Sequence, residues 1–167
     1  MNLTSNIPEQ TLGYIIKQMP NIKERKVSYH FGSYDELVRY LGVYKESNYP
    51  LVWLLPSSDT VSVDKIDKSC ELIVCIDFDK DQEDVLNPTR FDFTFTETLY
   101  PIADYLLEGI NITQGISYNS ESFIVDKFPN YQETESKIPH LWDAIKITLD
   151  VQFLNNKCLK PIRKWQS

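Results

Sequence analysis

The sequence predicts one α+β domain in which a mixed, mainly antiparallel sheet packs against helices. Three observations lead to this prediction. Residues 142–153 alternate between apolar and polar side chains, as a half-exposed strand does. The runs 51–55 and 70–78 are short and largely apolar, which favours buried strands. Residues 8–19 and 99–110 carry apolar side chains at helical spacing, which predicts two helices.

The N-terminal third contains the first helix and two strands. The helix over 8–19 has a proline in its first turn and ends at the next proline. The alternation over 26–31 predicts a strand. Ser33 and Glu36 then form a capping box, which predicts the start of a short helix. The apolar run in 50–55 is bracketed by prolines and predicts a buried strand.

The middle of the chain predicts the central strand of the sheet. Residues 61–79 form one long strand or one that is interrupted near Asp67 and Lys68. Both faces of its second half are apolar, which is typical of a strand with neighbours on both sides. The two cysteines in this half, Cys70 and Cys75, are five residues apart and are expected to point to opposite faces.

The second half predicts a helix over roughly 90–109, then irregular structure and the long final strand. Pro101 lies either in the first turn of a helix that begins near Thr98 or at a kink in a longer one. Residues 116–131 are polar and irregular, with a short strand expected at 122–127. Three residues in the first part of this range alternate as in a strand, which leaves that part ambiguous: Phe91, Phe93 and Phe95.

Length and composition predict a single domain over 1–156, followed by a basic C-terminal arm over 157–167. The chain has 167 residues, of which 42% are hydrophobic and 13% aromatic, enough for a core and an interface. The net charge of −7 argues against a general nucleic-acid binder. The three cysteines, Cys70, Cys75 and Cys158, form no disulfide framework. No signal peptide or membrane span is recognised, so we expect a protein that is soluble and intracellular or part of a particle assembled inside a cell.

The densest cluster of carboxylates follows the central strand and consists of Asp77, Asp79, Asp81, Glu83 and Asp84. Such a cluster could hold a divalent cation. The spacing lacks the glycine and the final glutamate of a calcium-binding loop, so a solvated turn is the favoured interpretation. The two histidines, His30 and His140, have no local catalytic partner, and no glycine-rich phosphate loop occurs. We therefore predict no enzyme activity, no cofactor and no metal.

The aromatic residue near the C-terminus has two interpretations. Trp165 either folds back on its own domain or anchors the arm in a neighbouring subunit. Trp142, at the start of the last strand, is interpreted as a core or sheet-edge residue. The candidate interface residues are Trp142, Arg163, Lys164 and Trp165.

Five segments in this order carry a family resemblance: 8–19, 49–56, 69–77, 99–107 and 141–153. The pattern resembles the tail-terminator and tail-completion proteins of tailed bacteriophages, which include ring proteins of the neck. That resemblance implies a structural virion protein that forms a ring, commonly of six or twelve copies, at the head–tail junction. It implies other neck and tail proteins as partners, assembly in the host cytoplasm, and DNA only as a passenger through the lumen. It implies no membrane association.

The resemblance also gives the acidic turn a role, because negative charge on the lumen would let DNA slide past. Asp77, Asp79, Asp81, Glu83 and Asp84 are therefore candidate luminal residues. Two other functions stay open: a metal-dependent hydrolase using Asp77, Asp79 and Asp81, and an acidic binding module whose surface mimics nucleic acid.

Overall fold

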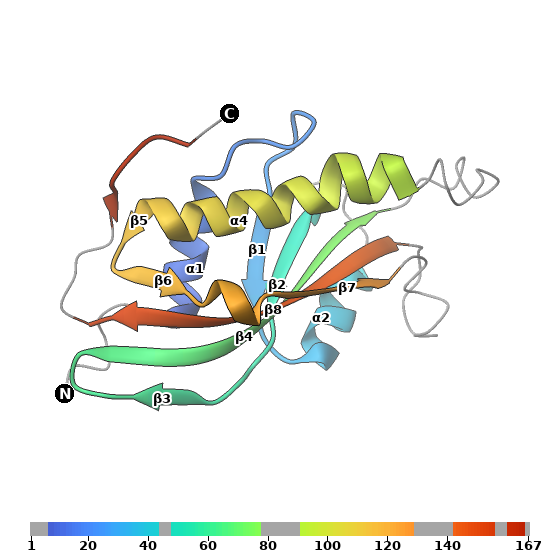
Figure 1. Ribbon diagram of the computed structural model, residues 1–167. Coiled ribbons are helices and arrows are strands. Elements are labelled where there is room, and N and C mark those ends of the chain that lie inside the picture. Colours follow the sequence, from blue (N-terminus) through green and yellow to red (C-terminus); the bar gives the residue numbers. More distant parts are fainter. Residues whose placement is uncertain (1–6, 44–47, 78–90, 129–141, 156–159, 166–167) are drawn as a thin grey trace.

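The computed structural model describes residues 7–43, 48–77, 91–128, 142–155 and 160–165 (Figure 1). The helices are α1 (Pro8–Lys17), α2 (Tyr34–Leu41), the π-helical segment η3 (Asp92–Leu99), α4 (Tyr100–Ile112) and the short 3-10 turn η4 (Ser120–Ser122). The strands are β1 (Ser28–Phe31), β2 (Leu51–Leu54), β3 (Asp59–Val61), β4 (Lys65–Asp77), β5 (Thr113–Gln114), β6 (Ile116–Tyr118), β7 (Ile124–Phe128), β8 (Trp142–Leu154) and β9 (Lys160–Pro161). Among these, no helix is both long and apolar enough to cross a membrane.

The predicted α+β class is confirmed by a seven-stranded, mostly antiparallel sheet. The sheet runs β1-β2-β4-β8-β6, with β3 also paired to β4 and β7 also paired to β8. The β1–β2 pair is parallel, and every other pair in this sheet is antiparallel. The β4–β8 ladder extends from Lys65 opposite Leu154 to Asp77 opposite Trp142. A separate two-stranded ladder joins β5 to β9.

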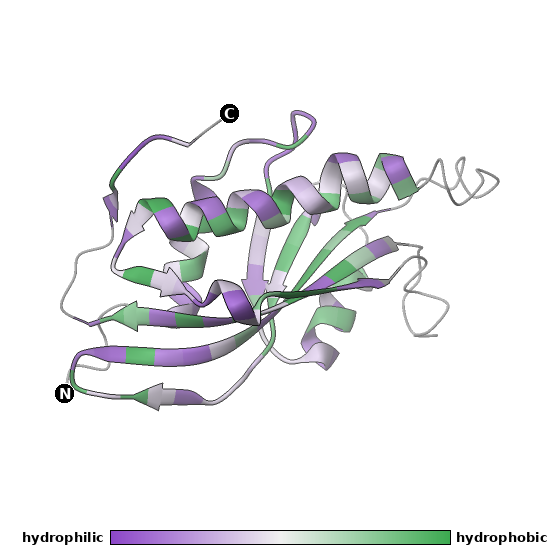
Figure 2. Ribbon diagram, viewed as in Figure 1, coloured by the Kyte–Doolittle hydropathy of each residue, from purple (hydrophilic) through white to green (hydrophobic). Residues whose placement is uncertain are grey.

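The two faces of the sheet are covered differently. The main core lies between one face and the helices α1 and α4, where side chains such as Leu12, Leu106 and Phe153 are buried. On the opposite face α2 covers only one end, with Leu37 and Leu41 packed against the strands. No described helix covers the rest of that face. Figure 2 shows hydrophilic and hydrophobic residues alternating along β8. The alternation predicted for the last strand is therefore confirmed.

The capping box predicted at the start of α2 is present. The Glu36 amide donates to Ser33 Oγ at 3.3 Å, and the Ser33 amide donates to the Glu36 carboxylate at 2.7 Å. The bond from the Ser33 amide lowers the pKa of Glu36. Both orphan donors are thereby satisfied, which fixes where the helix begins.

The structure resolves the ambiguity around Pro101. The π-helical segment η3 runs directly into α4, and Pro101 is the second residue of α4. The Tyr100 amide donates to the Phe95 carbonyl, five residues back. Proline has no amide hydrogen, and in an α-helix its ring clashes with the carbonyl four residues back. A π-helical turn, in which hydrogen bonds span five residues, suits this site. The strand-like alternation of the phenylalanines was misleading, because Phe91 and Phe95 stack one turn apart, with ring centroids 4.8 Å apart.

Two details of the strand predictions are wrong. The long strand breaks between β3 and β4, at residues 62–64, and continues without interruption through Asp67 and Lys68. The region expected to be irregular contains β6, which pairs with the end of β8. The strand expected over 122–127 is present as β7.

Cys70 and Cys75 lie on opposite faces of β4, as predicted, and both are buried and reduced. Burial raises the pKa of the Cys70 thiol to about 12 and also raises that of Cys75. Desolvation is the main cause at both sites, because the surrounding side chains cannot solvate a thiolate. Burial likewise raises the pKa of the Tyr29 hydroxyl.

These shifts predict loss of stability at alkaline pH. In the folded protein each thiol holds its proton more tightly than in the unfolded chain. Its contribution to the stability of the fold is therefore fully present below the unfolded pKa of 9.0 and is lost as pH rises through the folded pKa. We expect a constant melting temperature from pH 7 to 8 and a loss of about 1 kcal/mol per thiol at pH 10. Thermal unfolding across this range measures the slope. Cys75→Ala should flatten the slope whatever its effect at pH 7; an unchanged slope would contradict the prediction.

Candidate functional site

The acidic turn is described only at its first residue. Asp77 ends β4, and its carboxylate accepts a hydrogen bond from Arg25 Nη1 at 3.1 Å. The Asp77 side chain is only 14% exposed, so this ion pair ties the end of the central strand to the loop before β1. Asp79, Asp81, Glu83 and Asp84 lie outside the described residues.

The described part of the C-terminal arm lies on its own domain. Its strand β9 pairs with β5, and the Ile162 amide donates to the Ile112 carbonyl at 2.7 Å. The Trp165 ring is partly buried against Tyr105 of α4, edge to face, with centroids 6.2 Å apart. This is the folded-back arrangement of the two considered for Trp165.

The structure describes the other candidate interface residues only in part. Arg163 and Lys164 are exposed beside this packed tryptophan. The backbone of Trp142 pairs with that of Asp77 at the start of β8, and its side chain is outside the described part.

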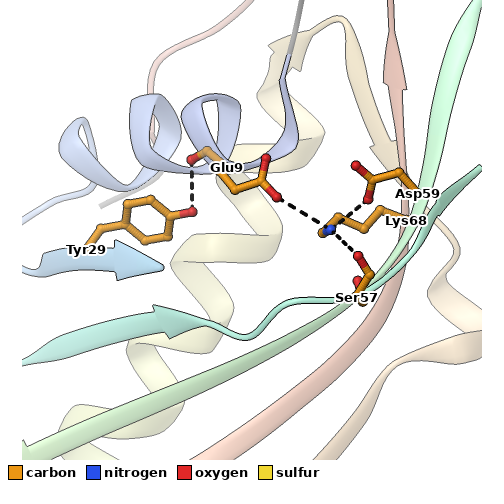
Figure 3. Close-up of polar contacts among 5 residues, drawn as sticks. All are labelled: Glu9, Tyr29, Ser57, Asp59 and Lys68. Atoms are coloured by element: carbon orange, nitrogen blue, oxygen red, sulfur yellow. Dashed lines mark hydrogen bonds and ion pairs between the residues drawn. The ribbon is translucent and has the colours of Figure 1, made fainter. Parts of the chain in front are cut away.

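A polar cluster that the sequence analysis did not predict surrounds Lys68 (Figure 3). The Lys68 side chain is 2% exposed, on the helix-covered face of β4. Its Nζ donates to Asp59 Oδ1 at 2.7 Å and to the Ser57 carbonyl at 3.2 Å, and lies 3.5 Å from Glu9 Oε1. The Tyr29 hydroxyl donates to the Glu9 carbonyl oxygen at 2.9 Å. These contacts join α1 to β1, β3 and β4.

The electrostatics of this cluster favour a structural role. Desolvation by itself lowers the pKa of Lys68, but the hydrogen bond and charge of Asp59, together with Glu9, raise it overall. Lys68 therefore stays protonated at neutral pH. A protonated amine has no lone pair for nucleophilic attack, so Lys68 acts as a buried ionic link between elements.

A hollow of about 490 Å³ lies on the open face of the sheet. The strand register places the residues at the base of this hollow side by side, since Asp67 of β4 and Ser117 of β6 both lie opposite Gln152 of β8. This hollow is open, and most of the residues that line it are polar, which is typical of solvated surface and not of an enclosed small-molecule site. Its polar lining residues are Ser58, Thr60, Asp67, Ser69, Ser117, Asn119, Asp150 and Gln152.

Within the part of the chain that the structure describes, the outermost strands of the sheet have no further strand partner: β1 and β3 lie on one side, and β6 and β7 lie on the other. At β1 the Ser28 amide donates to the Pro50 carbonyl, and the Gly32 amide donates to the Leu54 carbonyl. Backbone groups of a strand alternate sides, so those of Tyr29 and Phe31 face away from β2. At the other side of the sheet, β7 pairs with β8 alone. Each edge bears an exposed apolar side chain, Phe31 at 56% and Ile124 at 55%.

No protein-family model matches this chain, and no curated protein matches it. Within the described ranges, no group of three or more His, Cys, Asp or Glu side chains is placed to hold a metal ion. The features that remain to be interpreted are the sheet edges, the polar hollow and the Lys68 cluster.

Proposed function

We propose that this protein is a structural subunit of an oligomeric ring at the head–tail junction of a tailed bacteriophage, as a tail-terminator, tail-completion or neck ring protein. In this role the ring encloses the channel through which DNA passes. The proposal combines the family resemblance of the sequence with the surfaces of the fold.

The observation that carries the proposal is that β1 and β7 lie at opposite sides of one sheet, each with an edge that no described strand pairs with. An unpaired edge presents a row of backbone donors and acceptors that invites another strand. Two different edges on one subunit permit head-to-tail contacts, which close into a ring when the rotation between subunits allows it. A lone exposed apolar residue is ordinary, but here each edge bears one, Phe31 or Ile124.

The net charge of −7 also fits this role. A ring with an acidic inner wall repels the phosphates of DNA, so DNA moves through it without binding. Basic residues are needed for tight DNA binding, since they displace the counterions of the phosphates. We therefore expect no measurable affinity for duplex DNA at physiological salt.

The test is the molar mass of the purified full-length chain, measured by light scattering over a wide concentration range. A single closed oligomer of defined mass, seen as rings by electron microscopy, is the expected result. To include assembly that requires a template, binding is also measured with purified phage heads or tails that lack their junction protein. A chain that stays monomeric alone and does not bind either particle would refute the proposal.

A further inference from the structure

We infer that the β1 edge of one subunit pairs with the β7 edge of the next, which makes the sheet continuous around the oligomer. This inference rests on the proposed ring function and names the contact that builds the ring. The partner that binds the β1 edge is a second copy of this chain, which binds through its β7 strand.

The backbone at the two edges is suited to this pairing. In β1, the amide and carbonyl groups of Tyr29 and Phe31 face away from β2, and no described strand pairs with them. The strand β7 has β8 on one side and no described strand on the other. The two edge strands have four and five residues, so one can cover the other along nearly its whole length.

Strand direction favours the same pairing. The strand β1 is parallel to β2, and three antiparallel steps lead from β2 through β4 and β8 to β7. Hence β7 runs opposite to β1. Rotation about a ring axis that lies close to the strand direction preserves the direction of every strand. The β7 edge of a neighbour then meets β1 in the antiparallel orientation, which is slightly more stable per residue than the parallel one.

The side chains on the helix-covered face of the two edges fit one another. Phe31 lies on this face, because its partner in β2 is Leu54, a core residue. In β7 the residues of this face are Val125 and Lys127, opposite Ile147 and Ile145. Lys127 already lies over the Phe91 ring of its own subunit, with Nζ 5.9 Å from the centroid. A neighbour's exposed Phe31 ring would extend this aromatic surface and could bind the same ammonium group.

The side chains on the opposite face also fit. His30 lies on this face and is exposed, with its ring centroid 4.6 Å from that of Tyr40 in α2. Ile124 and Asp126 lie on the same face of β7, because Ile124 is opposite Thr148 and Asp126 is opposite Lys146. The aromatic surface would cover the exposed Ile124 side chain, and the Asp126 carboxylate could pair with the imidazole.

A twofold contact between two β1 strands is the main competitor, and it too would be antiparallel. It would form a closed dimer, use only one of the two edges and leave Ile124 in water. The head-to-tail contact covers Phe31 and Ile124 together. That difference favours β7 as the partner of β1.

The test is disulfide crosslinking of full-length variants in a Cys158→Ser background, in which the buried Cys70 and Cys75 are kept. His30→Cys is combined with Ile124→Cys in one variant and with Asp126→Cys in another. These pairs lie on the same face in two registers that differ by two residues. The matched control combines Phe31→Cys with Ile124→Cys, which lie on opposite faces and cannot reach disulfide geometry across a paired edge.

We expect mild oxidation to give a ladder of covalent multimers from at least one same-face variant and little from the opposite-face control. A dimer that forms equally well from His30→Cys alone would show the twofold contact and overturn the inference. If light scattering finds a closed oligomer but neither same-face variant crosslinks, the edge pairing is wrong and the ring proposal stands. A chain that remains monomeric with or without phage particles would contradict both.

Discussion

Replacing Asp59 with alanine is expected to destabilise the protein by about 3 kcal/mol, because the substitution leaves a buried ammonium group without its nearest counter-ion. Lys68 is 2% exposed and lies 2.7 Å from Asp59 Oδ1. After the substitution the polar partners that remain near it among the described residues are the Ser57 carbonyl and the more distant Glu9 carboxylate. Urea unfolding at pH 7, followed by far-UV circular dichroism, measures the change in unfolding free energy.

The matched variant removes the other partner of the same ion pair. Lys68→Met is expected to lower the free energy of unfolding by less, about 1 kcal/mol or below. Methionine fills the apolar site, and both carboxylates can be hydrated again. The Asp59 and Glu9 side chains are 32% and 27% exposed, so they already contact solvent. The double variant Asp59→Ala/Lys68→Met should recover most of the loss caused by Asp59→Ala. If the two single substitutions lower the unfolding free energy equally and their effects add in the double variant, the buried ion pair between Lys68 and Asp59 is contradicted.

The sequence contains a signal for this cluster that the strand prediction did not use. Ile66, Cys70 and Leu72 occupy alternate positions of β4, so Lys68 shares their face and enters the core with them. The prediction instead allowed a break in the strand at the charged residues. A lysine on an apolar face requires a counter-ion. Its partners, Asp59 and Glu9, come from β3 and α1, and local spacing does not identify them.

Elements with a strong local pattern were predicted well. The alternation along β8 and the capping box before α2 each determine structure over a few neighbouring residues. By contrast, β6 is three residues long and is a strand only because it pairs with β8. The η3 segment depends on Pro101 and on stacking between Phe91 and Phe95, which an alternation pattern cannot show. Short elements stabilised by distant contacts escape local prediction.

The candidate surfaces could be predicted only in part. The aromatic content and the lack of a catalytic motif indicated a protein that assembles. Strand order is a property of the whole fold, so the sequence could not show that β1 and β7 lie at opposite edges. The side chains that line the polar hollow come from four strands and two connecting segments. Their proximity depends on register between segments far apart in the chain.

Replacing Gly109 with alanine is expected to destabilise the protein by about 2 kcal/mol, although alanine is favoured over glycine in a helix by about 1 kcal/mol. Gly109 lies in α4, where α1 and the C-terminal segment both approach closely. A Cβ atom there would lie 2.5 Å from Ile15 Cγ2 and 2.5 Å from Trp165 Cη2. Both distances are far below van der Waals contact, so at least one neighbour must move.

The two neighbours differ in how easily they can move. Ile15 is 1% exposed in the main core, whereas Trp165 is held by a short segment with exposed residues on its N-terminal side. We therefore expect Trp165 to leave α4, with a shift of tryptophan fluorescence to longer wavelength, and Ile15 to account for the remaining loss of stability. Gly109→Ala/Trp165→Ala, compared with Trp165→Ala alone, isolates the Ile15 part. A Gly109→Ala protein that melts higher than the parent and keeps its fluorescence would show that the helix accepts the methyl group, and that the C-terminal segment does not depend on this contact.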